Sequence, residues 1–163
     1  MAVLMETSAL TRRTFLSLVG LSVLGAAARV HADDPIVVVV SAKSSQKDLS
    51  MGKLRRIFLN QATDDDDRNR FLPINAMAKS SLRVRFDQVV LDMSADEVGR
   101  YWVDQRIRGS QPPRTVPDFA LVRGVVAKWP GAIAYLPASQ LRADVKALAI
   151  DGHLPGMGGY PLR

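Results

Sequence analysis

The sequence predicts an α/β domain in three layers, with a small, mostly parallel sheet flanked by helices. Residues 36–40 are apolar and β-branched at every position, which is typical of a strand that helices cover on both faces. Further along, short apolar runs alternate with segments whose apolar residues recur at helical spacing. Serine or aspartate stands before several of these segments, in the position that caps a helix.

The first half of the domain is expected to hold two strands and two helices. After the strand at 36–40, a helix begins at Ser50 and buries Met51, Leu54, Ile57 and Phe58. A short strand follows at 71–75. The next helix begins at 79–81 and buries Leu82, Phe86, Val89 and Val90.

The second half is expected to repeat the alternation. Ser94 and Glu97 form a capping box that opens a helix, which stops at Gly109. After an extended connector at 111–114, Asp118 opens another helix. Strands are expected at 132–136 and 145–150, and the Gly- and Pro-rich residues 153–163 are expected to be a flexible tail.

Residues 1–32 have the organisation of an export signal. Arg12 and Arg13 form a basic segment, residues 15–28 are an apolar run, and small residues lead to cleavage after Ala32. The apolar run of fourteen residues is shorter than the ~20 residues that a membrane-spanning helix needs. A periplasmic domain at 33–152 is therefore expected, with no stable membrane span after cleavage.

The paired arginines indicate a route. Arg12 and Arg13 match the twin-arginine signal, which carries folded cargo, and Arg29 before the cleavage point suits that route. Ser17 stands where the strongest signals carry lysine. An ordinary secretory signal that holds two arginines is the alternative.

Composition excludes several classes of function. The chain has no cysteine, which excludes disulfides, thiol catalysis and iron–sulfur clusters. Its two histidines are His31, in the signal, and His153, in the tail, so no histidine-based triad or metal cluster is expected. We therefore predict a protein without cofactor that is not an enzyme.

The charge of +6 is spread along the chain rather than gathered in one run. The basic residues at 53–56 and 83–85 are interpreted as solvated helix faces, so no nucleic-acid partner is expected. Asp64–Asp67 lacks the alternating ligands of a calcium loop and is interpreted as a solvated acidic loop.

Five segments, taken in order, resemble phosphate-type periplasmic substrate-binding proteins. Residues 49–60 resemble the family's Leu-Ser-x-x-x-Leu-x-x-Ile-Phe-Leu-Gly segment, and residues 129–139 are similar to its Asn-Pro-Gly-Ala-Ile-Gly-Tyr-x-x-x-Ser segment. Between them, segments at 81–86, 101–102 and 109–114 follow the order of short, single-lobe members. The similarity covers about residues 36–152.

The resemblance implies one lobe of a type 2 periplasmic-binding fold. Complete receptors of this kind close two lobes on their ligand, and this chain supplies one. A single lobe either binds weakly at an open surface, pairs with another protein or a second copy of itself, or keeps the fold without a transport role.

The start of the helix after the second strand is the predicted anion site. A helix N-terminus offers unpaired N–H groups and a favourable dipole to phosphate or sulfate. Ser80 and Ser81 add hydroxyl donors, and Lys79 and Arg83 add charge. The resembled family reads Ser-Gly-Thr here, whereas this chain has Ser81 for glycine and Leu82 for threonine. Helix capping by serine alone is the alternative.

Two further places are candidates for the same ligand. Ser44 and Ser45 follow the first strand and would share the rim of a doubly wound sheet, or else form a polar turn. Arg114 follows two prolines and either faces the ligand or pairs with a carboxylate.

These observations favour an exported, non-enzymatic protein that binds phosphate or a similar small oxyanion. The alternative is a periplasmic adaptor that uses the lobe as a docking surface.

Overall fold

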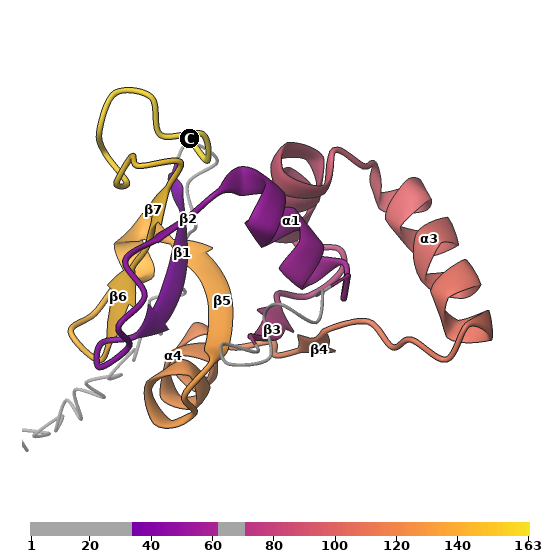
Figure 1. The fold of residues 1–163 in the computed structure, drawn as a ribbon, viewed down its shortest axis with the longest axis horizontal. Coiled ribbons are helices and arrows are strands. Elements are labelled where there is room, and N and C mark those ends of the chain that lie inside the picture. The colour runs from indigo at the N-terminus through magenta and orange to yellow at the C-terminus, as the bar shows by residue number, and fades with distance from the viewer. Residues whose placement is uncertain (1–33, 62–70) are drawn as a thin grey trace, which may run out of the picture.

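The structure is a computed structural model and describes residues 34–61 and 71–163. The predicted export signal and Asp64–Asp67 lie outside these residues. Its strands are β1 (Ile36–Ser41), β2 (Asp48–Leu49), β3 (Leu72–Asn75), β4 (Arg114–Thr115), β5 (Ala132–Pro137), β6 (Val145–Ala147) and β7 (Ala149–Ile150) (Figure 1). Its helices are α1 (Met51–Phe58), α2 (Ser81–Phe86), η2 (Asp87–Leu91), α3 (Ala95–Ile107), α4 (Phe119–Lys128) and η3 (Ala138–Gln140).

Five strands form one mixed sheet in the order β4-β3-β5-β1-β6, and β2 and β7 pair separately. β1 runs antiparallel to both of its neighbours, β5 and β6, while β3 runs parallel to β4 and β5. The α/β class is therefore confirmed. The sheet is mixed, because β1 alone runs against the direction of the other four strands. The uniformly apolar sequence of β1 indicates that both of its faces are buried. A central strand covered by helices on both sides is buried in this way whether it runs parallel or antiparallel to its neighbours.

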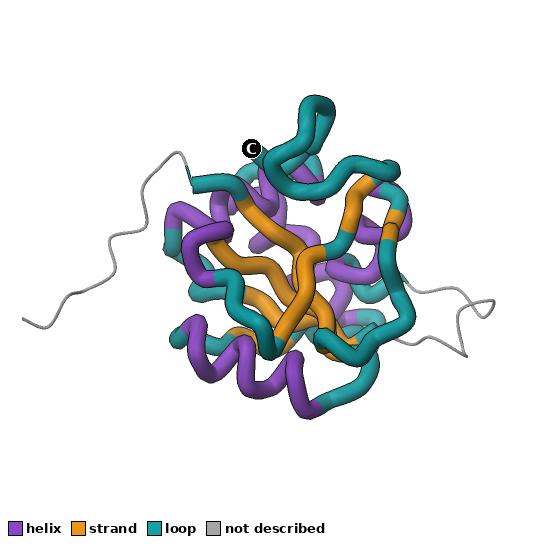
Figure 2. Tube along the Cα trace, turned by 90° about the vertical axis from the view of Figure 1, so that its left-hand side faces the viewer, coloured by secondary structure: helices purple, strands orange, loops and turns teal. Residues whose placement is uncertain are grey.

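Helices cover both faces of this sheet, as predicted (Figure 2). Alternate side chains of a strand point to opposite faces. Ile36, Val38 and Val40 therefore pack into one apolar cluster with α1, α2 and η2. Val37 and Val39 pack into the other cluster with Val122 and Val126 of α4.

The predicted helix starts agree with the structure. Ser50 Oγ accepts a hydrogen bond from Lys53 N at 3.2 Å and caps α1. Ser94 and Glu97 form the complete capping box of α3. Asp118 caps α4 through Leu121 N at 2.9 Å.

The second predicted helix differs in its last part. It is α-helical only to Phe86 and continues as the π-helical turn η2. A π-helical turn contains more residues than an α-helical one, so it rotates the side chains that follow. Val90 stays buried, but Val89 is 41% exposed, and its expected place in the core is wrong.

The last strand and the tail also differ from expectation. Residues 145–150 form two short strands: Leu148 N–H still donates to Val38 O of β1, and β7 then leaves the main sheet to join β2. The segment 153–163 was expected to be flexible, but it packs onto the domain. Tyr160 and Leu162 are buried, and Ile36 N donates to Leu162 O at 2.9 Å. Two apolar residues in a Gly-rich segment thus suffice to anchor it beside β1 (Figure 1).

Candidate functional site: a cleft beside Arg83

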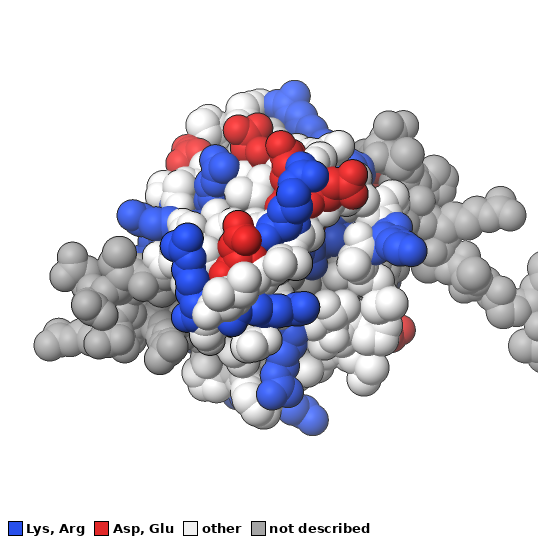
Figure 3. Space-filling model, turned by 90° about the vertical axis from the view of Figure 1, so that its right-hand side faces the viewer, with Lys and Arg blue, Asp and Glu red and all other residues white. Residues whose placement is uncertain are grey.

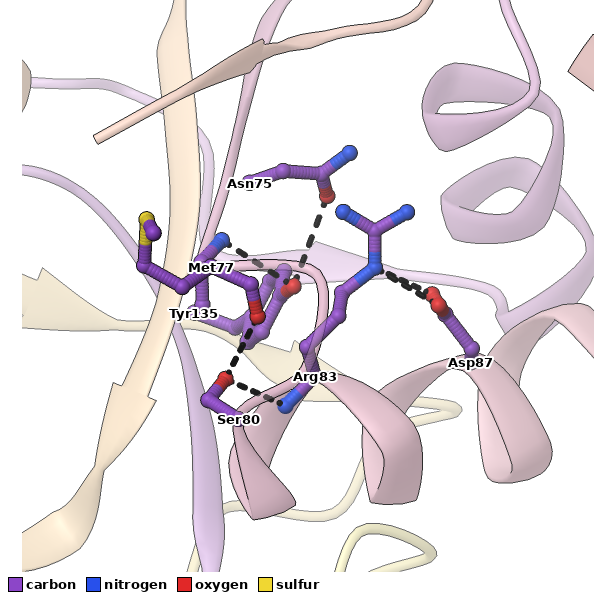
Figure 4. Close-up of polar contacts among 7 residues, drawn as sticks. Asn75, Met77, Ser80, Arg83, Asp87 and Tyr135 are labelled. Atoms are coloured by element: carbon purple, nitrogen blue, oxygen red, sulfur yellow. Dashed lines mark hydrogen bonds and ion pairs between the residues drawn. The ribbon is translucent and has the colours of Figure 1, made fainter. Parts of the chain in front are cut away.

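Ser80 is occupied as a helix cap. Its Oγ accepts from Arg83 N at 3.2 Å and donates to Met77 O at 2.8 Å (Figure 4). Ser80 also lines a small hollow of about 50 Å³. Ser80 therefore caps α2, and its hydroxyl proton is already donated to Met77 O.

Arg83 and Asp87 form a buried ion pair one helical turn apart. Arg83 Nε lies 2.7 Å and 2.6 Å from the two carboxylate oxygens, and both side chains are less than a tenth exposed. The interpretation of Arg83 as part of a solvated face is thus wrong. The spacing of four residues, typical of helical ion pairs, was a signal in the sequence that pointed to this contact.

Two opposing effects act on the pKa of the Asp87 carboxyl. Burial raises the pKa of its carboxyl above the ordinary value, and the charge and hydrogen bonds of Arg83 act in the opposite direction. Both bonds to the carboxylate come from Nε, whereas a guanidinium has five N–H donors. Figure 4 shows the two terminal nitrogens pointing away from Asp87. Arg83 also forms a side-chain hydrogen bond with the Tyr135 phenol, so Asp87 is not its only partner.

Tyr135 and Asn75 complete the polar layer. Tyr135 Oη accepts from Ala76 N at 3.2 Å and lies 3.4 Å from Asn75 Oδ1. Burial raises the pKa of the Tyr135 phenol, and the neighbouring charge of Arg83 opposes that shift. The Tyr135 ring stacks on Phe86 with centroids 3.7 Å apart, which fixes the hydroxyl beside Asn75.

A cleft of about 350 Å³ opens beside this pair, between β3, α2 and α3. Its wall contains the side chains of Asn75, Arg83, Asp87, Arg106 and Thr115 as polar groups. The remaining wall residues are small or apolar: Ala78, Ala95, Val98, Gly99, Trp102, Val103, Pro112 and Pro113. Two arginines in one cleft favour an anionic ligand.

Trp102 brings a further donor to this wall. It is 6% exposed, and its Nε1 is buried without a hydrogen-bond partner among the described residues. A buried donor without an acceptor costs about 1–3 kcal/mol, so such groups are uncommon in folded proteins. The Trp102 ring itself packs in the apolar cluster that contains α1 and α2.

Ser44 and Ser45 lie elsewhere. They line a different hollow, of about 610 Å³, with Ser41, Lys43 and Lys128. The reason is strand direction: β3 runs parallel to β5, and β5 runs antiparallel to β1. The carboxyl ends of β1 and β3 therefore point to opposite edges of the sheet, so these serines do not share a rim with Ser80.

The other predicted residues lie near the cleft without lining it. Lys79 and Ser81 are exposed beside the helix start. Arg114 is exposed in β4, while its neighbours Pro113 and Thr115 line the cleft. Because side chains alternate along a strand, Arg114 points to the other face. Of the predicted residues, Arg83 alone lines the cleft.

Asn75, Asp87, Trp102 and Arg106 were missed as site residues. Their proximity depends on how α3 packs against β3 and α2, which no local pattern encodes. Among residues 34–61 and 71–163, no cluster of three or more His, Asp or Glu side chains offers a metal site. No helix within the same residues is long and apolar enough to cross a bilayer.

Comparison with known proteins finds the fold but no close relative. No family model matches the chain, and no curated protein matches it. Among solved structures, a putative phosphate ABC transporter substrate-binding protein with bound phosphate from Clostridium perfringens is similar, with a TM-score of 0.59 and 18% identity. The similarity covers 74% of this chain and 46% of that one. The fold is that of one lobe of a phosphate-type binding protein.

Two further structures agree. An ABC-type phosphate transport receptor from Vibrio cholerae matches with a TM-score of 0.57 and 16% identity, over 72% of this chain and 46% of the receptor. PstS from Borrelia burgdorferi matches with a TM-score of 0.60 and 12% identity, over 79% and 54%. The chain thus spans about half the length of these proteins, and the predicted resemblance to a single lobe is confirmed at the level of the fold.

Proposed function

We propose that this chain is an exported, non-enzymatic binding protein that holds a small oxyanion in the cleft beside Arg83. The observation that carries this proposal is the buried guanidinium of Arg83. Asp87 orients it through Nε, and its terminal nitrogens point away from that carboxylate, with Tyr135 as a further side-chain partner. A guanidinium has five N–H donors, and those that Asp87 and Tyr135 leave over can bind phosphate, sulfate or carboxylate oxygens.

Two other features support the proposal. Arg106 of α3 lines the same cleft and adds a second positive charge. Basic side chains are spread over the face that carries α3, with acidic ones mostly in its upper half (Figure 3). A mild positive field of this kind attracts small anions. The similar structures include phosphate-binding proteins, so phosphate is the first ligand to test.

Calorimetric titration of the full chain with phosphate and with sulfate tests the proposal. We expect Arg83→Lys to weaken binding about tenfold or more, because lysine keeps the charge but loses the paired donors. Arg106→Gln is expected to weaken it less, because this residue is exposed at the cleft wall.

Arg108→Gln is the matched control, because Arg108 is exposed at the end of the same helix and does not line the cleft. Circular dichroism establishes that each variant is folded. Binding that is absent in the unaltered chain, or that survives Arg83→Lys undiminished, contradicts the proposal.

A docking function is the second candidate, and exposed apolar side chains of α3 at and beside the cleft favour it. Ile107 is 82% exposed and Val103 is 57% exposed on this helix. Exposed apolar side chains on one helix face are typical of protein contacts. If the lobe pairs with a second copy or a partner there, Ile107→Lys should convert a dimer to a monomer in analytical ultracentrifugation. A chain that is monomeric at all concentrations and binds anion supports the first function instead.

Export is a proposal that the sequence alone supports. N-terminal sequencing of protein from the periplasmic fraction should find a chain that begins at Asp33. Replacement of Arg12 and Arg13 by lysine should block the twin-arginine route and leave an ordinary secretory route working.

A further inference from the structure

We infer that the cleft binds an organic oxyanion, in which an apolar body is attached to the charged head, in preference to inorganic phosphate. This rests on the proposed function, since the head is held by Arg83. It adds the class of ligand, which the chemistry of the cleft wall indicates.

The wall is mostly apolar. Away from Arg83, the cleft is lined by Val98, Trp102, Val103, Pro112 and Pro113. An inorganic anion is hydrated on all sides and gains nothing from such a surface, whereas an apolar body is stabilised by leaving water. Cavities of 300–1,000 Å³ with apolar walls and a few convergent polar groups are typical sites of small organic ligands. The volume of about 350 Å³ lies within that range.

Gly99 keeps part of the cleft open. It lies in the middle of α3, where glycine is less favourable than alanine by about 0.5–1 kcal/mol. It also lines the cleft, and a Cβ built there would meet nothing within 4 Å. No neighbouring atom therefore requires glycine at this position. The space that a side chain would fill is the space that the apolar body of a ligand would occupy.

Trp102 supplies an independent indication. Its indole forms part of the apolar wall, yet its Nε1 donor is buried and lacks an acceptor in the described part of the chain. A ligand that carries both an apolar body and oxygen acceptors fits both properties of this side chain.

A matched pair of probes separates the head from the body. Phenyl phosphate and inorganic phosphate share the charged head and differ in the ring, so calorimetry with the full chain measures the contribution of the ring. We expect phenyl phosphate to bind about tenfold or more tightly than inorganic phosphate, from burial of the ring.

Gly99→Leu places an apolar side chain in the open space and is expected to remove most of that preference. Binding of inorganic phosphate should fall less than binding of phenyl phosphate, because Gly99→Leu takes the space of the ring and leaves Arg83 in place. Gly124→Leu is the control, since Gly124 is also a mid-helix glycine with open space at its Cβ but lies in α4, away from the cleft.

The possible outcomes are distinct. A phenyl phosphate preference that Gly99→Leu removes and Gly124→Leu keeps supports the inference. Equal binding of both probes, with both dependent on Arg83, overturns the inference and leaves the proposed function standing. Binding of neither probe overturns the proposed function as well.

Discussion

The centre of the sheet and its β3 end differ in how they use buried side chains. β1 and β5 are buried at all twelve positions, and these are almost entirely apolar. Around β3 and α2, by contrast, Asn75, Arg83 and Asp87 are buried although they are polar or charged. All three line the cleft, and Ser41, the remaining buried polar residue of the described chain, lines the other hollow.

The apolar centre of the sheet stabilises the fold, whereas the β3 end supplies the polar groups of the candidate site. Burial of apolar surface at β1 and β5 stabilises the fold without any specific partner. Burial of Arg83 and Asp87 is unfavourable unless each charge is paired, so this end of the sheet depends on the contact between the two side chains. A polar group that is buried at a cleft is a stronger indication of binding than an exposed one.

The largest effect on stability is expected in the centre of the sheet. Ile133 of β5 is fully buried in the cluster shared with α1 and α2. Ile133→Ala removes three methyl or methylene groups and leaves a cavity, which should lower the free energy of unfolding by about 4 kcal/mol. Urea denaturation measures this change. Anion affinity of the folded variant should be unaltered, and a large loss of affinity would contradict the separation of the two regions.

The next effect is expected at the ion pair. Asp87→Asn leaves the buried Arg83 charge without its partner and should lower the free energy of unfolding by about 3 kcal/mol. The double variant Arg83→Met with Asp87→Leu replaces both charges by apolar groups and should recover most of this loss in urea denaturation. Anion binding should be lost in the double variant even so. A stable double variant that binds phosphate as the unaltered chain does would place the ligand elsewhere.

Local sequence patterns were sufficient for the elements but not for their relation to each other. The helix caps Ser50, Ser94 and Asp118 act within one helical turn, so their residues identify the helix starts directly. The direction of β1 depends on its neighbours, which its own apolar side chains do not specify. The same limitation put Ser44 and Ser45 on the wrong edge of the sheet.

The site shows the same limitation. Arg83 and Asp87 are four residues apart on a helix, so their ion pair could be predicted from the sequence. Trp102 and Arg106 reach the cleft only because α3 packs beside β3, which is a tertiary contact. The anchoring of Tyr160 against β1 is likewise a contact between the two ends of the described chain.

A smaller effect is expected from Tyr160, which tests whether the final segment belongs to the apolar region. Its hydroxyl donates to Ile36 O at 2.9 Å, so Tyr160→Phe should lower the free energy of unfolding by about 1 kcal/mol. Burial raises the pKa of Tyr160 from 10.0 to about 12. Between these pH values the folded chain holds a proton that the unfolded chain releases, so stability falls as pH rises.

Urea denaturation above pH 10 should therefore show a steeper loss in the unaltered chain than in Tyr160→Phe. Parallel pH profiles for the two proteins would mean that the hydroxyl is not buried in solution.

The smallest effect is a gain. Gly99→Ala should raise the free energy of unfolding by about 0.5–1 kcal/mol, because alanine favours the helix and Cβ meets open space. Thermal denaturation measures it. A loss of stability would show that the space at residue 99 is already filled by neighbouring atoms, and would weaken the comparison between the two regions.

The most direct test of the cleft uses the two tryptophans of the chain as reporters. Trp102 lines the cleft, whereas Trp129 is 60% exposed and stands between Lys128 and Pro130, which line the hollow of Ser44 and Ser45. In a ¹H–¹⁵N spectrum, phosphate or phenyl phosphate should shift the indole N–H signal of Trp102 and leave that of Trp129 in place. A shift of Trp129 alone, or no shift of either signal at millimolar ligand, would contradict anion binding beside Arg83.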